Sequence, residues 1–209
     1  MRRYKNVAVC EQTTIHPDRK GRVPPNTCLS STLSWGAGRF MSMSNSDLQR
    51  IQLEYQTQYA QQEKLQVLIP DAVLSEFRAT KICEFLTPIS IREFSEWGRN
   101  RLASFQAHDV MMVVLQYEAP DRPTYAHWIG LKYSPEEGIA LFDQLNETQE
   151  LKALPSEGIS VDSLIATATT LIDDHGIMEG TSMALTKIHP AIYRFDNPAS
   201  TRRGYQIYK

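Results

Sequence analysis

The chain has 209 residues, of which 42% are hydrophobic and 22% are charged, and its formal net charge is −2. This length and apolar content suit a globular protein with a substantial core and argue against a disordered chain. Basic residues are spread along the sequence rather than clustered, which argues against a nucleic-acid-binding protein. No stretch approaches the roughly 20 consecutive apolar residues of a membrane-spanning helix, so we expect no membrane span.

The cysteine count limits the chemistry further. Three cysteines are present, Cys10, Cys28 and Cys83, and none of them forms a Cys-x-x-Cys pair. This small, odd number argues against a disulfide scaffold and against a structural zinc site. The chemistry considered below for Cys28 also needs no metal and no organic cofactor, so we expect neither. The N-terminus is basic but lacks an apolar core of signal-peptide length, which disfavours classical secretion.

The first half of the sequence predicts mainly helices. Residues 1–27 are polar and broken by prolines, so we expect an irregular segment. A helix is predicted to begin at Cys28, with Asn26 or Thr27 as its cap. Further helices are predicted from the spacing of apolar residues over 46–66 and over 71–86. Ser90 and Glu93 form a capping-box pattern before another helix that reaches about residue 105.

The second half predicts mainly strands. Residues 110–115 are an apolar run typical of a buried strand, and 125–133 and 139–145 flank a turn at 135–138. A helix is expected over 161–173, and terminal strands over 183–188, 191–195 and 205–208. The predicted arrangement is one α+β catalytic domain over 28–209, helical over 28–107 and sheet-rich over 108–209.

Cys28 is a candidate nucleophile because of its position at a predicted helix start. A thiol there ionises more easily, since the unpaired N–H groups and the helix dipole favour negative charge. A catalytic thiol also needs an imidazole as base and a third group to orient that imidazole. His127 and Asp143 each interrupt an otherwise apolar strand, on the two sides of the predicted hairpin. They are our candidates for these two roles.

The predicted pairing of this hairpin does not bring His127 and Asp143 together by itself. If Ser134 pairs with Ile139, Asp143 falls opposite Gly130, three residues from His127. A bulge or a different turn would be needed to join the two side chains.

Three short patches of the sequence resemble the YopT/AvrPphB family of papain-like cysteine proteases, which are effectors that bacteria inject into host cells. They are residues 26–35 (NTCLSSTLSW), 126–130 (AHWIG) and 140–143 (ALFD). The resemblance implies a papain-like fold, in which a helical lobe holds Cys28 at a helix N-terminus against an antiparallel sheet. It also implies Cys28 as nucleophile, His127 as general base and then acid, and Asp143 as the orienting carboxylate.

The resemblance does not assign the side chain of an oxyanion hole, and this chain lacks the glycine that often precedes the family's nucleophile. Our candidates are Asn26 and, behind it, Gln12, together with the backbone N–H of Cys28. We expect a monomer that cleaves a host protein and is delivered into the host cytoplasm by a specialised bacterial system; otherwise the protein is expected to be cytoplasmic.

Three other functions stay open from the sequence. The same three residues could serve a protein glutamine deamidase or transglutaminase, because only the leaving group and the acceptor differ. A peptidoglycan amidase is another possibility, since such enzymes place a histidine in a similar apolar strand. A binding module in which Cys28 is only packed is the non-enzymatic alternative.

Overall fold

The computed structural model describes residues 10–14, 24, 26–60, 69–84, 87–101, 105–106, 109–120, 122–134, 138–144, 148–152, 166, 169–170 and 183–196. Its helices are α1 (Cys28–Gly36), α2 (Asn45–Ala60), α3 (Asp71–Glu76) and α4 (Ile91–Arg101), with a short 3₁₀ helix, η1, at Phe40–Ser42. In the described part of the chain, no helix is both long and apolar enough to cross a membrane.

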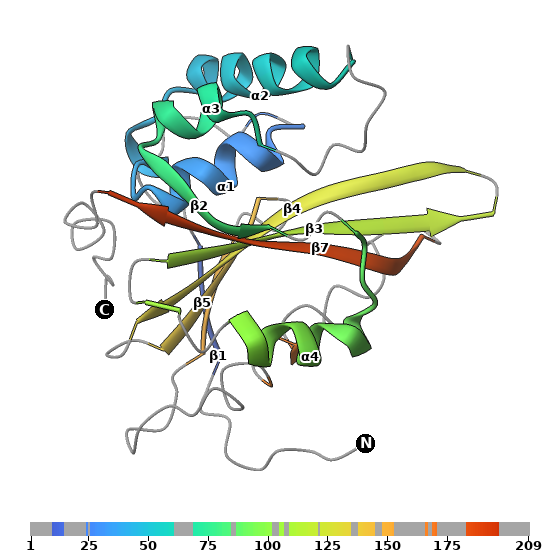
Figure 1. Cartoon of the computed structure of the whole chain (residues 1–209). Coiled ribbons are helices and arrows are strands. Elements are labelled where there is room, and N and C mark those ends of the chain that lie inside the picture. Colours follow the sequence, from blue (N-terminus) through green and yellow to red (C-terminus); the bar gives the residue numbers. More distant parts are fainter. Residues whose placement is uncertain are drawn as a thin grey trace.

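The strands form one antiparallel sheet with the order β1-β6-β5-β4-β3-β7-β2. They are β1 (Cys10–Thr14), β2 (Ala79–Glu84), β3 (Asp109–Ala119), β4 (Arg122–Ser134), β5 (Gly138–Asp143), β6 (Thr148–Lys152) and β7 (Ala184–Phe195). Helices α1, α2 and α3 lie over one face of this sheet and α4 lies under the other (Figure 1). Strand β3 is buried almost throughout because both of its faces are covered.

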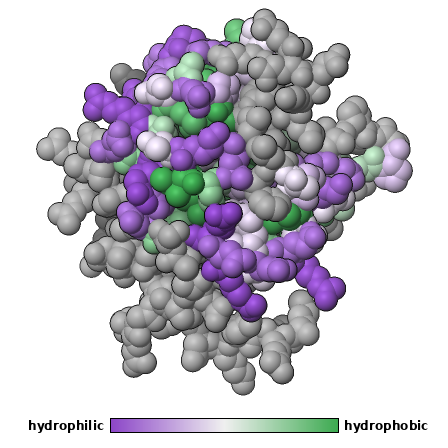
Figure 2. All heavy atoms as spheres, in the orientation of Figure 1, coloured by the Kyte–Doolittle hydropathy of each residue, from purple (hydrophilic) through white to green (hydrophobic). Residues whose placement is uncertain are grey.

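Side chains alternate between the two cores along β3, as the period of two in a strand requires. Val110, Met112 and Val114 belong to the core under α1, α2 and α3, whereas the odd-numbered residues 111, 113 and 115 belong to the core around α4. On the side of the molecule drawn in Figure 2, hydrophilic residues cover much of the coloured surface and hydrophobic residues show in small patches.

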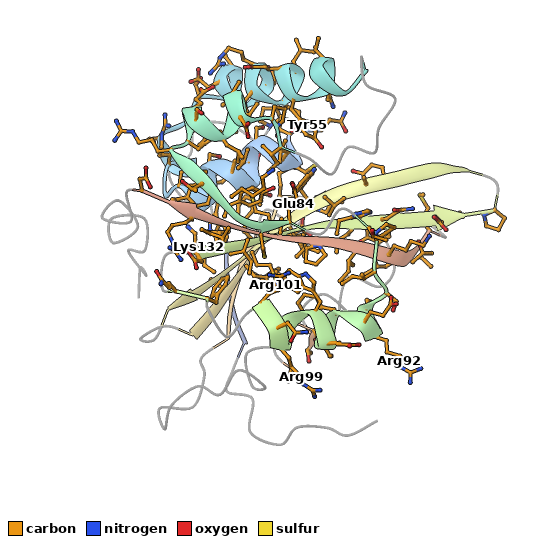
Figure 3. The ribbon with its side chains drawn as sticks, in the orientation of Figure 1. Tyr55, Glu84, Arg92, Arg99, Arg101 and Lys132 are labelled. Carbon is orange, nitrogen blue, oxygen red and sulfur yellow. The ribbon has the colours of Figure 1, made fainter. Side chains whose placement is uncertain are left out.

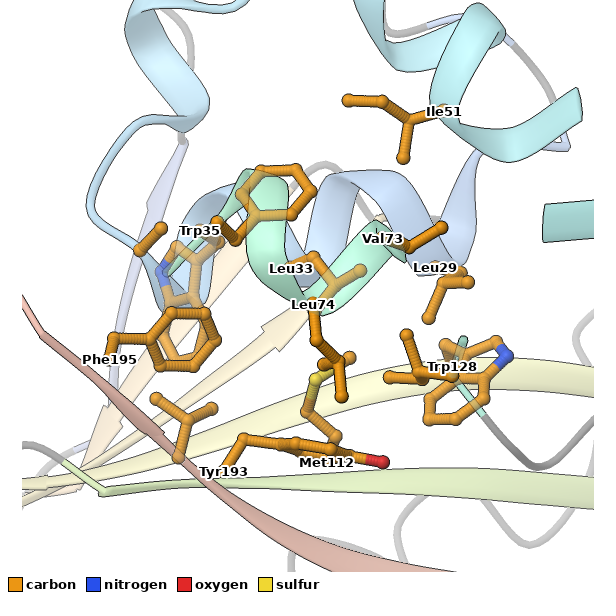
Figure 4. Packing of buried hydrophobic residues seen from close by; sticks show 14 of the residues in the cluster. Leu29, Leu33, Trp35, Ile51, Val73, Leu74, Met112, Trp128, Tyr193 and Phe195 are labelled. Atoms are coloured by element: carbon orange, nitrogen blue, oxygen red, sulfur yellow. The ribbon is translucent and has the colours of Figure 1, made fainter. Parts of the chain in front are cut away.

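Helix α1 is almost completely buried. It lies between α2 and the sheet, with Leu29, Leu33 and Trp35 in the core (Figure 4). Its close approach to β4 depends on Gly130, where an added Cβ would lie 2.9 Å from side-chain atoms of both Thr32 and Trp35. The strand on which the predicted histidine lies is therefore in direct contact with the helix that begins at Cys28.

The predicted capping box at the start of α4 is confirmed. The Glu93 carboxylate accepts from the Ser90 N–H at 2.7 Å, and the Ser90 hydroxyl accepts from the Glu93 N–H at 3.3 Å. Phe94 and Trp97 face the sheet, whereas Arg92 and Arg99 point away from it (Figure 3). The helix ends at Arg101, and the expected extension to 105 crosses residues 102–104, which lie outside the described part.

One predicted element in the helical half is corrected. The single helix expected over 71–86 is instead α3 followed by β2, which ends at Glu84, and residues 85–86 lie outside the described part. The break lies at Arg78, whose φ of 51° is left-handed and ends the helical path. Strand β2 then forms because it pairs with β7. Helix α2 is confirmed up to Ala60, and the rest of the expected range, 61–66, lies outside the described residues.

The N-terminal segment and the region after β5 also differ from the predictions. Residues 10–14, expected to be irregular, form β1, and the strand β6 was not predicted. β1 pairs with β6 along its whole length, and β6 pairs with β5. These sequences lack an apolar alternation, so pairing with neighbouring strands stabilises them as strands.

The two strands predicted at 183–188 and 191–195 form one continuous strand, β7. The separation had been placed at Pro190, which has no N–H to donate. The Ile188 N–H donates to Ile89 on the side away from β3, and by alternation the Pro190 nitrogen faces the same side. β2 has already ended opposite Ala191, so no ladder bond is lost. Of the helix expected over 161–173, the structure describes residues 166, 169 and 170, which are helical, and the strand expected at 205–208 lies outside the described residues.

Candidate active site

Cys28 is the first residue of α1, as predicted, and its thiol is free and half-buried. Thr27 occupies the cap position but makes no capping hydrogen bond; its hydroxyl donates instead to the Pro24 carbonyl at 2.7 Å. The Ser30 N–H in the first turn of α1 donates a hydrogen bond to the side-chain oxygen of Gln52 in α2, at 3.3 Å. The predicted local cap is thus corrected: a side chain from another helix takes over this role.

Asn26, a candidate for the oxyanion hole, lies in the turn just before α1. It is exposed, and its φ of 58° is left-handed, a conformation that asparagine tolerates better than most residues. This turn brings the chain from Pro24 into the helix that begins at Cys28. Asn26 therefore lies at the same end of α1 as the thiol.

The structure brings His127 and Asp143 together. His127 Nε2 lies 2.6 Å from Asp143 Oδ1, and both side chains are almost completely buried. Their contact follows from a register that differs by one residue from the predicted one: Ser134 pairs with Gly138, so Asp143 pairs with Ile129 rather than Gly130. A shift of one residue moves a side chain to the other face of the sheet, and it places Asp143 on the same face as His127.

The surroundings of His127 favour its protonated form. Burial lowers the pKa of His127, but the hydrogen bond to Asp143 and the interaction with the Cys28 side chain outweigh burial and raise it to about 9. Among the described residues, His127 Nδ1 has no partner at hydrogen-bond distance. The hydrogen bond that holds the ring is therefore the one from Nε2 to Asp143, and Cys28 acts on the same ring.

Gln12, the other oxyanion candidate, is not brought to this pair. Gln12 of β1 aligns through β6 and β5 with Leu131 of β4. Leu131 is four residues from His127 along the strand, and β1 is three strands away from β4. At about 4.8 Å per strand and 3.3 Å per residue, the two positions are separated by roughly 20 Å along the sheet.

Two tyrosines lie beside the predicted catalytic residues and were not predicted. Tyr125 precedes His127 by two residues on β4 and pairs with Tyr117 of β3. Burial, followed by the proximity of Cys28 and Asp143, raises the pKa of Tyr125. Because side chains two residues apart share a strand face, the position of His127 could have pointed to Tyr125.

Gln144 was also missed. It follows Asp143 directly, is buried, and donates to the Pro24 carbonyl at 3.2 Å. A polar residue next to the apolar strand β5 was the available signal. Within the described residues, no group of three or more histidine, cysteine, aspartate or glutamate side chains is arranged to hold a metal ion.

Comparison with known proteins adds evidence on the fold. No protein-family model matches the sequence, and no curated protein matches it. One solved structure, described as that of the Pseudomonas avirulence protein AvrPphB, is similar over 87% of this chain and 95% of that chain, with a TM-score of 0.53 and 10% sequence identity. AvrPphB is a papain-like cysteine protease effector, so the predicted papain-like α+β fold is confirmed.

Proposed function

We propose that this protein is a thiol hydrolase, and specifically a cysteine protease, with Cys28 as nucleophile, His127 as acid and base, and Asp143 as the orienting carboxylate. The observation that carries the proposal is the buried hydrogen bond between His127 and Asp143, next to a thiol at a helix start. Such a thiol, imidazole and carboxylate are the parts that nucleophilic acyl transfer needs.

The Nδ1 atom of His127 fits the proton transfers. Because Nε2 is bound to Asp143, Nδ1 is the atom that exchanges protons. The Cys28 sulfur attacks the carbonyl carbon of a peptide bond, and His127 gives a proton to the departing amine. A thioester remains. Water then attacks it as His127 takes up a proton, and the acid product and the thiol are released.

The negative oxygen of the tetrahedral intermediate needs hydrogen-bond donors. We assign the Cys28 backbone N–H and the Asn26 side chain to this role. Both lie at the N-terminal end of α1, where the helix dipole also favours negative charge. We leave Gln12 out of this proposal, because β1 is three strands away from β4 in the sheet order.

For the substrate, we propose a host protein cleaved by an effector that bacteria deliver. The support is the sequence resemblance together with the fold likeness to AvrPphB. A Cys28→Ala variant should capture the substrate without cleaving it, and mass spectrometry would identify it. Two fragments after treatment with the active protein indicate proteolysis, whereas a gain of about one dalton indicates deamidation instead.

The first test is the reactivity of the thiol. We expect iodoacetamide at neutral pH to label Cys28 much faster than Cys83, a half-buried thiol whose pKa is raised by burial. The His127→Ala variant should lose this advantage. Peptide mapping by mass spectrometry measures both thiols in one sample. Equal labelling of the two thiols in the wild-type protein would contradict the proposal.

A further inference from the structure

Gln144 links two parts of the chain that are distant in sequence. It directly follows Asp143 at the end of β5, and its side-chain nitrogen donates to the carbonyl of Pro24, 120 residues earlier, at 3.2 Å. Pro24 is itself buried and lies four residues before Cys28. One side chain thus ties the strand end that carries Asp143 to the segment that leads into α1.

The Pro24 carbonyl receives a second hydrogen bond. The Thr27 hydroxyl donates to it at 2.7 Å, and the Thr27 carbonyl accepts from the Ser31 N–H at 2.8 Å. A continuous path of contacts therefore runs from Gln144 through Pro24 and Thr27 into the first turn of α1. A shift of the Gln144 carboxamide would be passed to the residues on both sides of Cys28.

Burial of the Gln144 carboxamide lowers the stability of the fold if the side chain only fills space. Gln144 is only 6% exposed, and its side-chain oxygen has no hydrogen-bond partner among the described residues. Burying a polar atom without a partner destabilises the fold, because the atom loses its hydrogen bonds to water and gains none in the protein. An apolar side chain of the same length would fill the space without that cost, but it could not bind Pro24.

We propose that Gln144 is a positioning residue that sets the distance between the Cys28 sulfur and the His127 ring, by holding residues 24–28 against the end of β5. This inference rests on the proposed function, because it matters only if the thiol and the imidazole react together. Gln144 touches neither group in this role; it acts through Pro24 and Thr27.

The test compares Gln144→Met with the wild-type protein. Methionine keeps the length of the side chain and removes the donor. We expect the alkylation rate of Cys28 at pH 7 to fall by about three- to tenfold, the loss equivalent to one hydrogen bond. The pH profile of alkylation should shift to higher pH, since the imidazole then supports the thiolate less well. Cys83 in the same sample is the internal reference.

Two further variants serve as a control for changes elsewhere in α1 and as a second way to remove the hydrogen bond to Pro24. Ser34→Ala removes a buried hydroxyl at the other end of α1 and should leave the pH profile unchanged. Gln144→Glu keeps the shape of the side chain, and its carboxylate cannot donate to Pro24, so it should shift the profile in the same direction. Thermal unfolding identifies which variants are folded.

The outcomes separate this inference from the proposed function. If wild-type Cys28 labels fast and depends on His127, but a folded Gln144 variant gives the wild-type profile, the positioning role is wrong and the proposed function stands. If wild-type Cys28 shows no dependence on His127, the proposed function itself fails.

Discussion

The two sides of the proposed site are held in different ways. His127 and Asp143 lie on adjacent strands, 16 residues apart, and the β4–β5 pairing places them together. Cys28 depends on contacts across the whole chain. Thr32 in its helix donates to the Trp128 carbonyl 96 residues away, and Gln144 reaches Pro24 across 120 residues.

This difference means that the imidazole and the thiol are positioned by separate parts of the fold. The histidine–carboxylate pair needs only one hairpin with the right register. The thiol needs α1 packed against β4 and its first turn held in place. Changes at α1 should therefore alter thiol reactivity while leaving the pair intact, and changes at the pair should leave α1 packed.

The largest effect is expected for Asp143→Asn. The amide keeps the shape but cannot stabilise a protonated imidazole or hold the same tautomer, so cleavage of the trapped substrate should fall by roughly 10³–10⁴-fold. The matched control is Asp109→Asn, which changes the other buried aspartate in the described residues, one that pairs with Arg194. Equal losses of kcat/KM in the two variants would show that Asp143 has no special part.

The free energy of unfolding should depend on pH through the ionisation of the His127 imidazole. The pKa of His127 is raised from 6.5 to about 9, so protonated His127 stabilises the fold fully below pH 6.5. That contribution, at most on the order of 3 kcal/mol, is lost as the pH rises through 9. Denaturant unfolding of the wild type and of His127→Gln from pH 6 to 9.5 measures it. A constant difference between the two proteins would contradict the assigned ionisation.

The Gly130→Ala variant tests whether the packing of α1 against β4 positions the Cys28 thiol. The added Cβ would clash with Thr32 and Trp35, so the variant should lose about 1–3 kcal/mol of unfolding free energy and Cys28 should react more slowly. Gly36→Ala is the matched control, because its Cβ meets the Phe195 ring at the far end of α1, at 2.7 Å. It should lose stability with a smaller effect on Cys28. The reverse ranking in iodoacetamide labelling would overturn the link between Gly130 and the thiol.

The smallest effect is expected at a feature outside both sides of the site. Ser90→Ala breaks the capping box of α4 and should lower the unfolding free energy by about 1 kcal/mol. Helix α4 lies on the opposite face of the sheet from α1 (Figure 1). Cys28 labelling should therefore match the wild type, and a slower rate would mean that the two faces are coupled.

The sequence by itself determined the features that arise from local order. The start of α1 at Cys28, the capping box of α4 and the buried strand β3 all follow from residues close together in the chain. The short patches around Cys28, His127 and Asp143 also carried the prediction of a papain-like fold, which the structure confirms. The catalytic roles of these residues remain a prediction.

Tertiary structure decided everything that depends on a partner far away. β1, β2 and β6 are strands because a neighbouring strand supplies their hydrogen bonds. The β4–β5 register differs by one residue from the value that the turn residues suggested, and that single step puts Asp143 on the face of His127. The role of Gln144 could not be predicted for the same reason: its polar side chain next to the apolar strand β5 marked the position, but its partner Pro24 is 120 residues away and no local pattern records such a contact.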